Sequence, residues 1–197
     1  MIVKIESIYD LLSLFSLYIN LYAGYNFDIV MCIGIFLCVF FQDFIKEITY
    51  GWYPIIFKRP TGAINCNLFN KGGLVDNNSG FPSGHVTVVS FFMNLLFLRK
   101  YNNFKCITTM FDTNNASGNV LTCNFITILL YNVPIVLMGY ARVMKGCHNL
   151  VQVIAGYILG FIIASTVYYF ENIYITYIEK IDQYKRPAKK DVNLKIK

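Results

Sequence analysis

The two histidines of the chain are its side chains best suited to chemistry near neutral pH, and each stands at the start of an apolar stretch. His85 follows Pro82-Ser83-Gly84, and His148 follows a short turn after Arg142. The free amides and positive dipole end of a helix N-terminus favour an anion, and Gly84 lets a ligand approach the backbone closely. The pattern therefore predicts one phosphate-type site shared by both histidines.

The composition indicates the setting in which this site is built. Hydrophobic residues make up 56% of the 197 residues and charged residues only 14%, and the mean hydropathy is +0.49. Soluble domains contain about 25% charged residues. We therefore expect an integral membrane protein with an all-α fold, a polytopic helix bundle with its active site at one membrane face. We expect a single transmembrane domain at 1–179, followed by a basic tail at 180–197.

Five apolar segments approach the length of about 20 residues that spans a bilayer. They are 8–25, 28–50, 86–98 with its flanks, 120–140 and 150–178. The first segment carries Asp10, Ser13, Ser16 and Asn20, so an interfacial helix is the alternative for it. The last exceeds the bilayer thickness and is expected to tilt or to continue as an amphipathic helix.

The loop at 54–82 fixes the face on which the site lies. It is rich in Gly, Asn and Pro, and its backbone needs water or protein partners, so it cannot cross the membrane. Counting crossings from this loop places both histidines and the Lys58-Arg59 pair on one face. The opposite face carries Arg99, Lys100, Lys105 and the basic tail, which predicts a cytoplasmic tail and a lumenal or extracellular site. The endoplasmic reticulum is one candidate membrane.

Three motifs in chain order carry a family resemblance. Lys58-Arg59-Pro60, then Pro82-Ser83-Gly84-His85, then Arg142 with His148 resemble the three signatures of the type 2 phosphatidic acid phosphatase superfamily, the membrane lipid phosphate phosphatases. The family pattern is Lys, six residues, Arg-Pro; Pro-Ser-Gly-His; and Ser-Arg, five residues, His, three residues, Asp. Each motif alone is weak evidence, but three in order on one membrane face are specific.

The resemblance implies a role for each matching residue. His148 would attack phosphorus to form a phosphohistidine, and His85 would protonate the leaving group and then activate water. The positions that match phosphate-binding residues of the family are Arg59, Ser83, Gly84 and Arg142. No metal or other cofactor is implied, and no cluster of ligand residues suggests one.

The chain departs from the family pattern at three positions. Trp52 stands where the first signature has lysine, so either Lys46 or Lys58 would supply that cation, with a slight preference for Lys46. Ala141 replaces the serine of the third signature. Gln152 replaces the aspartate that would orient His148, and this glutamine resembles the dolichyl pyrophosphate phosphatase branch. A glutamine carbonyl can orient the ring but supplies no charge.

These features leave several functions open. The leading expectation is hydrolysis of a lipid phosphate or polyprenyl diphosphate in a membrane; the alternatives are a phosphotransferase of related architecture and a catalytically silent lipid-phosphate-binding protein. No nucleic-acid motif is present, and the sequence leaves the oligomeric state open. Cys66 and Cys147 both fall on the face of the site, where a disulfide is one possibility. The sequons at Asn77 and Asn115 fall on opposite faces.

Overall fold

The computed structural model describes residues 8–50, 56–63, 74–75, 79–101 and 125–185. The described residues are helical without a named strand, and a single isolated bridge pairs Lys58 with Ser79. The helices are α1 (Ile8–Tyr25), α2 (Ile29–Thr49), α3 (Gly84–Tyr101), α5 (Phe125–Met144) and α6 (Leu150–Lys185). The expected all-α class is therefore confirmed. Several residues considered above lie outside the described part: Trp52, Cys66, Asn77, Lys105, Asn115 and the tail from 186.

Local chemistry explains where the helices begin and end. Asp28 caps α2, because its carboxylate accepts a hydrogen bond from the Met31 amide at 2.9 Å. Helix α5 ends later than the expected span of 120–140, of which residues 120–124 lie outside the described part, and Gly146 reverses the chain behind it with φ of 65°. This left-handed turn brings the chain directly into α6.

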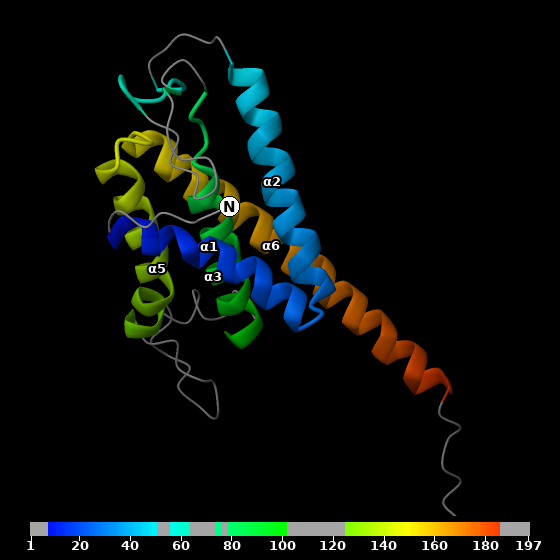
Figure 1. The fold of residues 1–197 in the computed structure, drawn as a ribbon. Coiled ribbons are helices and arrows are strands. Elements are labelled where there is room, and N and C mark those ends of the chain that lie inside the picture. Colours follow the sequence, from blue (N-terminus) through cyan, green and yellow to red (C-terminus); the bar gives the residue numbers. More distant parts are fainter. Residues whose placement is uncertain (1–7, 51–55, 64–73, 76–78, 102–124, 186–197) are drawn as a thin grey trace, which may run out of the picture.

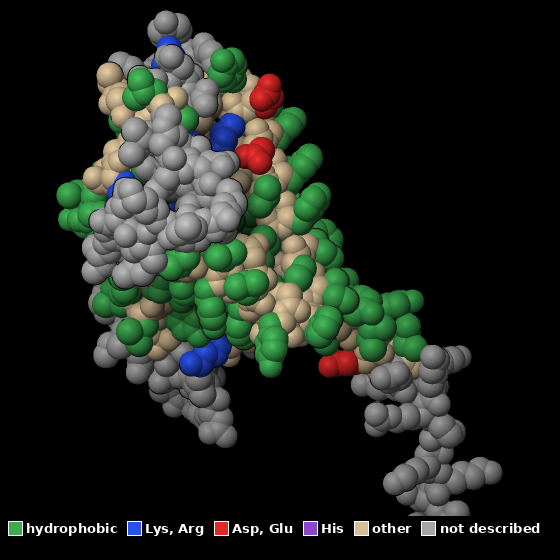
Figure 2. Space-filling view, in the orientation of Figure 1, with side chains coloured by type: hydrophobic (Ala, Val, Ile, Leu, Met, Phe, Trp, Pro, Cys, Tyr) green, Lys and Arg blue, Asp and Glu red, His purple; other side chains and the backbone are tan. Residues whose placement is uncertain are grey.

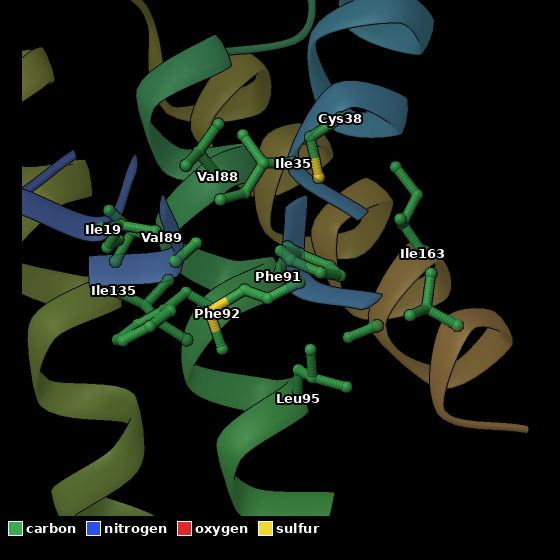
Figure 3. Close-up of a cluster of buried hydrophobic side chains, with 14 of the residues drawn as sticks. Ile19, Ile35, Cys38, Val88, Val89, Phe91, Phe92, Leu95, Ile135 and Ile163 are labelled. Atoms are coloured by element: carbon green, nitrogen blue, oxygen red, sulfur yellow. The ribbon is translucent and has the colours of Figure 1, made fainter. Parts of the chain in front are cut away.

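Helix α3 lies at the centre of the bundle. It packs most extensively on α6 and also contacts α1, α2 and α5. Figure 3 shows the buried cluster around it, in which Phe91 and Leu95 of α3 meet Ile19 of α1, Ile35 of α2 and Ile163 of α6. Gly156 and Gly160 allow the closest approach, because a Cβ at either would lie 2.6 Å or less from a backbone oxygen of the segment 83–87.

Three helices are long and apolar enough to cross a membrane: Ile29–Thr49, Thr127–Met144 and Leu150–Ile181. Their exposed side chains suit lipid, and Figure 2 shows hydrophobic side chains covering this face of the bundle. Helices α1 and α3 fall outside this set. The reason in α3 is its polar residues, whose hydrogen bonds stay inside the bundle; Ser90 Oγ, for example, donates to the Tyr157 carbonyl at 2.8 Å.

Helix α6 is longer than a bilayer requires. Its 36 residues extend for about 54 Å, against a hydrocarbon core of about 30 Å. It continues to Lys185, beyond the expected end at 178, and Figure 1 shows its last turns projecting past the other helices. At the level where it leaves the bundle, Glu171 accepts hydrogen bonds from Arg99 of α3, at 2.7 Å for the closest pair, and Arg99 also binds Asp28.

Candidate active site

Six of the residues singled out in the sequence line one cavity of about 310 Å³: Lys46, Arg59, Gly84, His85, Arg142 and His148. Every described helix contributes to the walls or adjoins them. The lining residues are Ser16, Asn20, Gln42, Asp43, Lys46, Arg59, Gly84, His85, Val88, Arg142 and His148. Both histidines and both arginines thus face the same space.

His148 is held in one tautomer by its hydrogen bonds. Its Nδ1 lies 3.0 Å from the Gly80 carbonyl oxygen and 3.1 Å from Gln152 Oε1. Both of these atoms only accept hydrogen bonds, so Nδ1 must carry the proton. The lone pair is therefore on Nε2, which is free to act as a base or a nucleophile.

Gln152 fixes this arrangement through both ends of its amide. Its Nε2 donates to the carbonyl oxygens of Lys58 at 2.7 Å and Ile56 at 3.0 Å. Because these two carbonyls require a donor, the amide cannot be turned over, and Oε1 must face His148. The side chain is fully buried. Gln152 thereby connects the nucleophile to the segment that carries Arg59.

Asn149 and Gln152 also start α6 with a capping box. Asn149 Oδ1 accepts from the Gln152 amide at 3.0 Å, and the Asn149 amide donates back to Gln152 Oε1 at 3.3 Å. His148 stands immediately before this cap, so the start of α6 sets its position. The Gln152 carbonyl accepts from the Ser83 amide at 2.9 Å and ties the second signature to the third.

The two arginines reach the cavity from different elements. Arg59 Nη1 donates to the Cys147 carbonyl at 3.3 Å, next to the nucleophile. Arg142, near the end of α5, is only 1% exposed, and its Nη2 donates to Ser13 Oγ at 2.7 Å. Burial lowers the pKa of Arg59 from its ordinary value, but a guanidinium stays charged near neutral pH. Two fixed positive charges therefore adjoin His148.

The second signature lies at the first turn of α3. Gly84 and His85 line the cavity, and a Cβ at Gly84 would lie 2.0 Å from Gln42 Oε1. Ser83 Oγ is fully buried, has no hydrogen-bond partner among the described residues, and is not part of the cavity lining. Its phosphate-binding role stays a prediction.

The structure also separates the two lysines considered for the first signature. Lys46, in the last turn of α2, lines the cavity and is paired with Asp43 at 3.1 Å. Lys58 is absent from the lining, and its carbonyl oxygen is an acceptor for Gln152. The geometry therefore places the ammonium of Lys46, not that of Lys58, beside the histidines.

The positive charges and the burial keep His148 neutral. Burial is the main cause, and the Arg59 guanidinium is the next; together they lower the pKa of His148 from 6.5 to about 3, against the opposing hydrogen bond to Gln152. Nε2 is therefore unprotonated at neutral pH. A phosphate dianion would balance the net positive charge of this site, where Lys46, Arg59 and Arg142 outnumber Asp43.

A bonded cysteine immediately precedes His148 in the chain. Cys147 is disulfide-bonded, while Cys66, considered as its partner, lies outside the described residues. Among the described residues, no group of three or more His, Cys, Asp or Glu side chains is arranged to hold a metal ion.

Several residues at or beside the cavity were missed as site residues by the sequence analysis: Ser13, Ser16, Asn20, Gln42 and Asn149. Asn149 had a readable signal, since Asn-x-x-Gln before an apolar run is typical of a capping box. The serines and Asn20 were noted only as polar residues that weakened a membrane span. Their three- and four-residue spacing on one helix face was the available signal.

Fold and site together define a membrane helix bundle with a two-histidine, two-arginine anion site. The family model of the PAP2 superfamily matches residues 28–174, so the chain belongs to this superfamily. No curated protein and no solved structure gives a significant match. Members of the superfamily are phosphatases, and membership supports a phosphatase-type function on a lipid phosphate. The match begins at Asp28 and leaves α1 outside it.

Proposed function

We propose that the protein is a metal-independent membrane phosphatase that hydrolyses a lipid phosphate or a polyprenyl diphosphate through a phosphohistidine at His148. The observation that carries the proposal is the fixed tautomer of His148, whose Nδ1 proton is held by Gly80 and Gln152. This leaves a neutral Nε2 in a cavity with two guanidinium groups. A neutral nucleophile beside fixed positive charge is what attack on a phosphate dianion requires.

In the first half of the reaction, His148 Nε2 forms a bond to phosphorus as the bond from phosphorus to the leaving oxygen breaks. His85 donates its proton to that oxygen, so that the lipid leaves as an alcohol or as a monophosphate. Arg59 and Arg142 stabilise the charge on the equatorial oxygens. Developing positive charge on the His148 ring is met by the Gln152 carbonyl oxygen.

In the second half, water attacks the phosphohistidine and the P–N bond breaks. His85 accepts a proton from that water, which restores both histidines and releases inorganic phosphate. If a lipid alcohol takes the place of water, the same site acts as a phosphotransferase. Product analysis separates the two reactions, because only hydrolysis yields inorganic phosphate.

The test is phosphate release by the purified full chain in detergent, with chelator present. Phosphatidate, lysophosphatidate and a polyprenyl diphosphate are the substrates. We expect release from at least one of them, and a loss of roughly a thousandfold or more in His148→Ala and His85→Ala. Acid-labile label from a ³²P substrate should stay on the native chain after rapid quenching and be absent from His148→Ala.

Retention of activity in both variants would overturn the mechanism. Absence of release from every substrate, with phosphate still bound, would support a lipid-phosphate-binding protein instead. The neutral Gln152 in place of the family's aspartate is the feature that favours this second function.

A further inference from the structure

Helix α1 lies outside the family match, yet it forms part of the cavity wall. Figure 1 shows it running obliquely across the bundle, and it packs on α2, α3 and α5. Its polar residues Ser13, Ser16 and Asn20 follow three- and four-residue spacing and so share one face. The buried apolar residues Ile19 and Ala23 anchor the adjacent face in the core.

At one end of the polar face of α1, Ser13 contacts Arg142, which lines the cavity. Ser13 is 1% exposed and donates its own proton to the Tyr9 carbonyl at 3.2 Å, so its oxygen is available to accept from Arg142 at 2.7 Å. Ser16 and Asn20 continue the same face along the cavity, and Asn20 is exposed to solvent. The row therefore extends from a phosphate-binding arginine to the mouth of the cavity.

The cavity is larger than a phosphate group. A phosphate takes roughly the volume of two or three water molecules of about 30 Å³ each, whereas the cavity measures about 310 Å³. The wall beyond the histidines and arginines consists of Ser16, Asn20, Gln42, Asp43 and Lys46. A polar wall next to the reacting phosphate suits a polar group of the substrate and not its lipid chain.

This wall presents hydrogen-bond acceptors beside the ammonium of Lys46 and the side-chain amides of Asn20 and Gln42. The hydroxyl proton of Ser16 is donated to the Ser13 carbonyl at 2.9 Å, which leaves the Ser16 oxygen to accept. Asn20 Nδ2 donates to the Ser16 carbonyl at 2.7 Å, which leaves Oδ1. Gln42 Oε1 is buried without a hydrogen-bond partner among the described residues. Asp43 adds a carboxylate, paired with Lys46.

We infer that α1 and the facing turn of α2 form a subsite for a hydrogen-bond-donating group, a hydroxyl or an amine, carried by the substrate close to its reacting phosphate. A second phosphate offers only acceptors and negative charge, which the oxygens of Ser16, Asn20 and Asp43 oppose, and the ammonium of Lys46 is already paired with Asp43. A hydroxyl or an amine can instead donate to the oxygens of Ser16 and Asn20 along the cavity. The inference rests on the proposed phosphate site and narrows its substrate class to hydroxyl- or amine-bearing phosphate esters.

The test measures binding of phosphonates that cannot be hydrolysed, by calorimetry on the full chain in detergent. Butyl phosphonate and dihydroxybutyl phosphonate differ only in their hydroxyls, and methylene bisphosphonate represents a second phosphate. We expect the dihydroxy compound to bind roughly fivefold to tenfold more tightly than butyl phosphonate, the effect of one or two hydrogen bonds. It should also bind more tightly than the bisphosphonate.

Asn20→Leu and Ser16→Ala should remove most of this difference while leaving butyl phosphonate binding unchanged. Asn26→Leu is the matched control, because Asn26 makes the same type of hydrogen bond, to the Tyr22 carbonyl at 2.8 Å, but does not line the cavity. It should bind all three compounds as the native chain does.

Each remaining result has a distinct meaning. Equal binding of the two butyl compounds would overturn the subsite and leave the phosphate site standing. Tighter binding of the bisphosphonate would replace it with a second-phosphate subsite. If none of the compounds binds, both the subsite and the phosphate site are wrong, whereas phosphate release from lipids tests the proposed reaction separately.

Discussion

Gln152 stands where the family pattern has aspartate, and it makes hydrogen bonds that a carboxylate could not make. A carboxylate could accept from His148, but it could not donate to the carbonyls of Ile56 and Lys58, both within 3.0 Å of Nε2. Those carbonyls belong to the three residues that precede Arg59 in the chain. The amide therefore positions both His148, the proposed nucleophile, and the segment of Arg59, whereas an acid at this position would contact only His148.

Gln152→Glu separates the contact with His148 from the contact with the two carbonyls. The side chain keeps its size and an oxygen that accepts from His148, but it loses the N–H groups that donate to Ile56 and Lys58. We expect inorganic phosphate and vanadate to bind about tenfold more weakly, since two carbonyl oxygens would then face a carboxylate. The measurement is competitive inhibition of phosphate release. Asn149→Asp is the control, because it keeps the Oδ1 acceptor of the helix cap and loses only the longer hydrogen bond, at 3.4 Å, from Asn149 Nδ2 to the Ile56 carbonyl. Unchanged inhibition with faster turnover would show that only the orientation of His148 matters.

His148 also makes the stability of the protein depend on pH. Its pKa is about 3 in the folded chain, against the ordinary value of 6.5. Below about pH 6.5 the unfolded chain binds a proton at His148 that the folded chain does not bind. The contribution of His148 to the free energy of unfolding is therefore fully present above that pH and is lost as the pH falls toward 3. The full effect is on the order of 5 kcal/mol.

The check is thermal unfolding in detergent from about pH 7 to about pH 4.5. The native chain should lose more stability over this range than His148→Gln, which cannot titrate. Equal losses in the two chains would place the acid sensitivity elsewhere in the molecule.

At the scale of elements, the contact between α3 and α6 sets the distance between the two histidines. A Cβ at Gly156 would lie 2.6 Å from the Ser83 carbonyl oxygen, immediately before the turn that carries His85. Gly156→Ala should therefore force α3 away from the start of α6. We expect a cost of about 1–3 kcal/mol in stability and a loss of roughly tenfold or more in turnover.

Gly24→Ala is the matched control, because nothing lies within 4 Å of its added Cβ. It should be neutral or slightly stabilising, since alanine favours helix over glycine by up to about 1 kcal/mol. Unfolding temperature and phosphate release are measured on both variants. Equal behaviour would mean that the bundle accommodates the methyl group at Gly156 without moving the site.

The elements differ in how far the sequence could predict them. Hydropathy predicted α1 at 8–25, the bounds that the structure shows, and the three motifs predicted which helix ends meet. The end of α5 was predicted too early, because its polar last turn carries Arg142 into the bundle and not to water. The contact between Ser13 and Arg142 joins positions 129 residues apart, and such a pairing depends on packing that no local pattern encodes.

At the scale of the whole molecule, Arg99 joins three helices at the end opposite the site. It binds Asp28 before α2 and Glu171 in α6, with each side chain at most 25% exposed. Arg99→Leu would leave two partly buried carboxylates without this guanidinium. We expect a loss of about 1–3 kcal/mol in stability and unchanged turnover per folded molecule. A loss of turnover without a change in unfolding would show that this cluster acts on the site.

The orientation of the chain follows from what each set of positive charges is bound to. The cavity is lined by three cationic side chains, Lys46, Arg59 and Arg142. They contribute to the positive charge of the cavity, so their positions carry little information on membrane topology. Arg99 and Lys100 close α3 at the other end, where Glu171 of α6 binds Arg99 and α6 continues to Lys185. Counted without the cavity residues, the positive-inside rule predicts a cytoplasmic tail and an extracytoplasmic site.

Glycosylation in a eukaryotic secretory pathway tests this orientation. The native sequon at Asn115 and a sequon added after the tail should both remain unmodified, because both are predicted to be cytoplasmic. A sequon introduced in the loop that carries Asn77 and extended by a flexible linker should receive a glycan. Modification of Asn115 or of the tail would show that the orientation is the reverse of the predicted one. The proposed enzyme would then take its phosphate esters from the cytoplasmic leaflet.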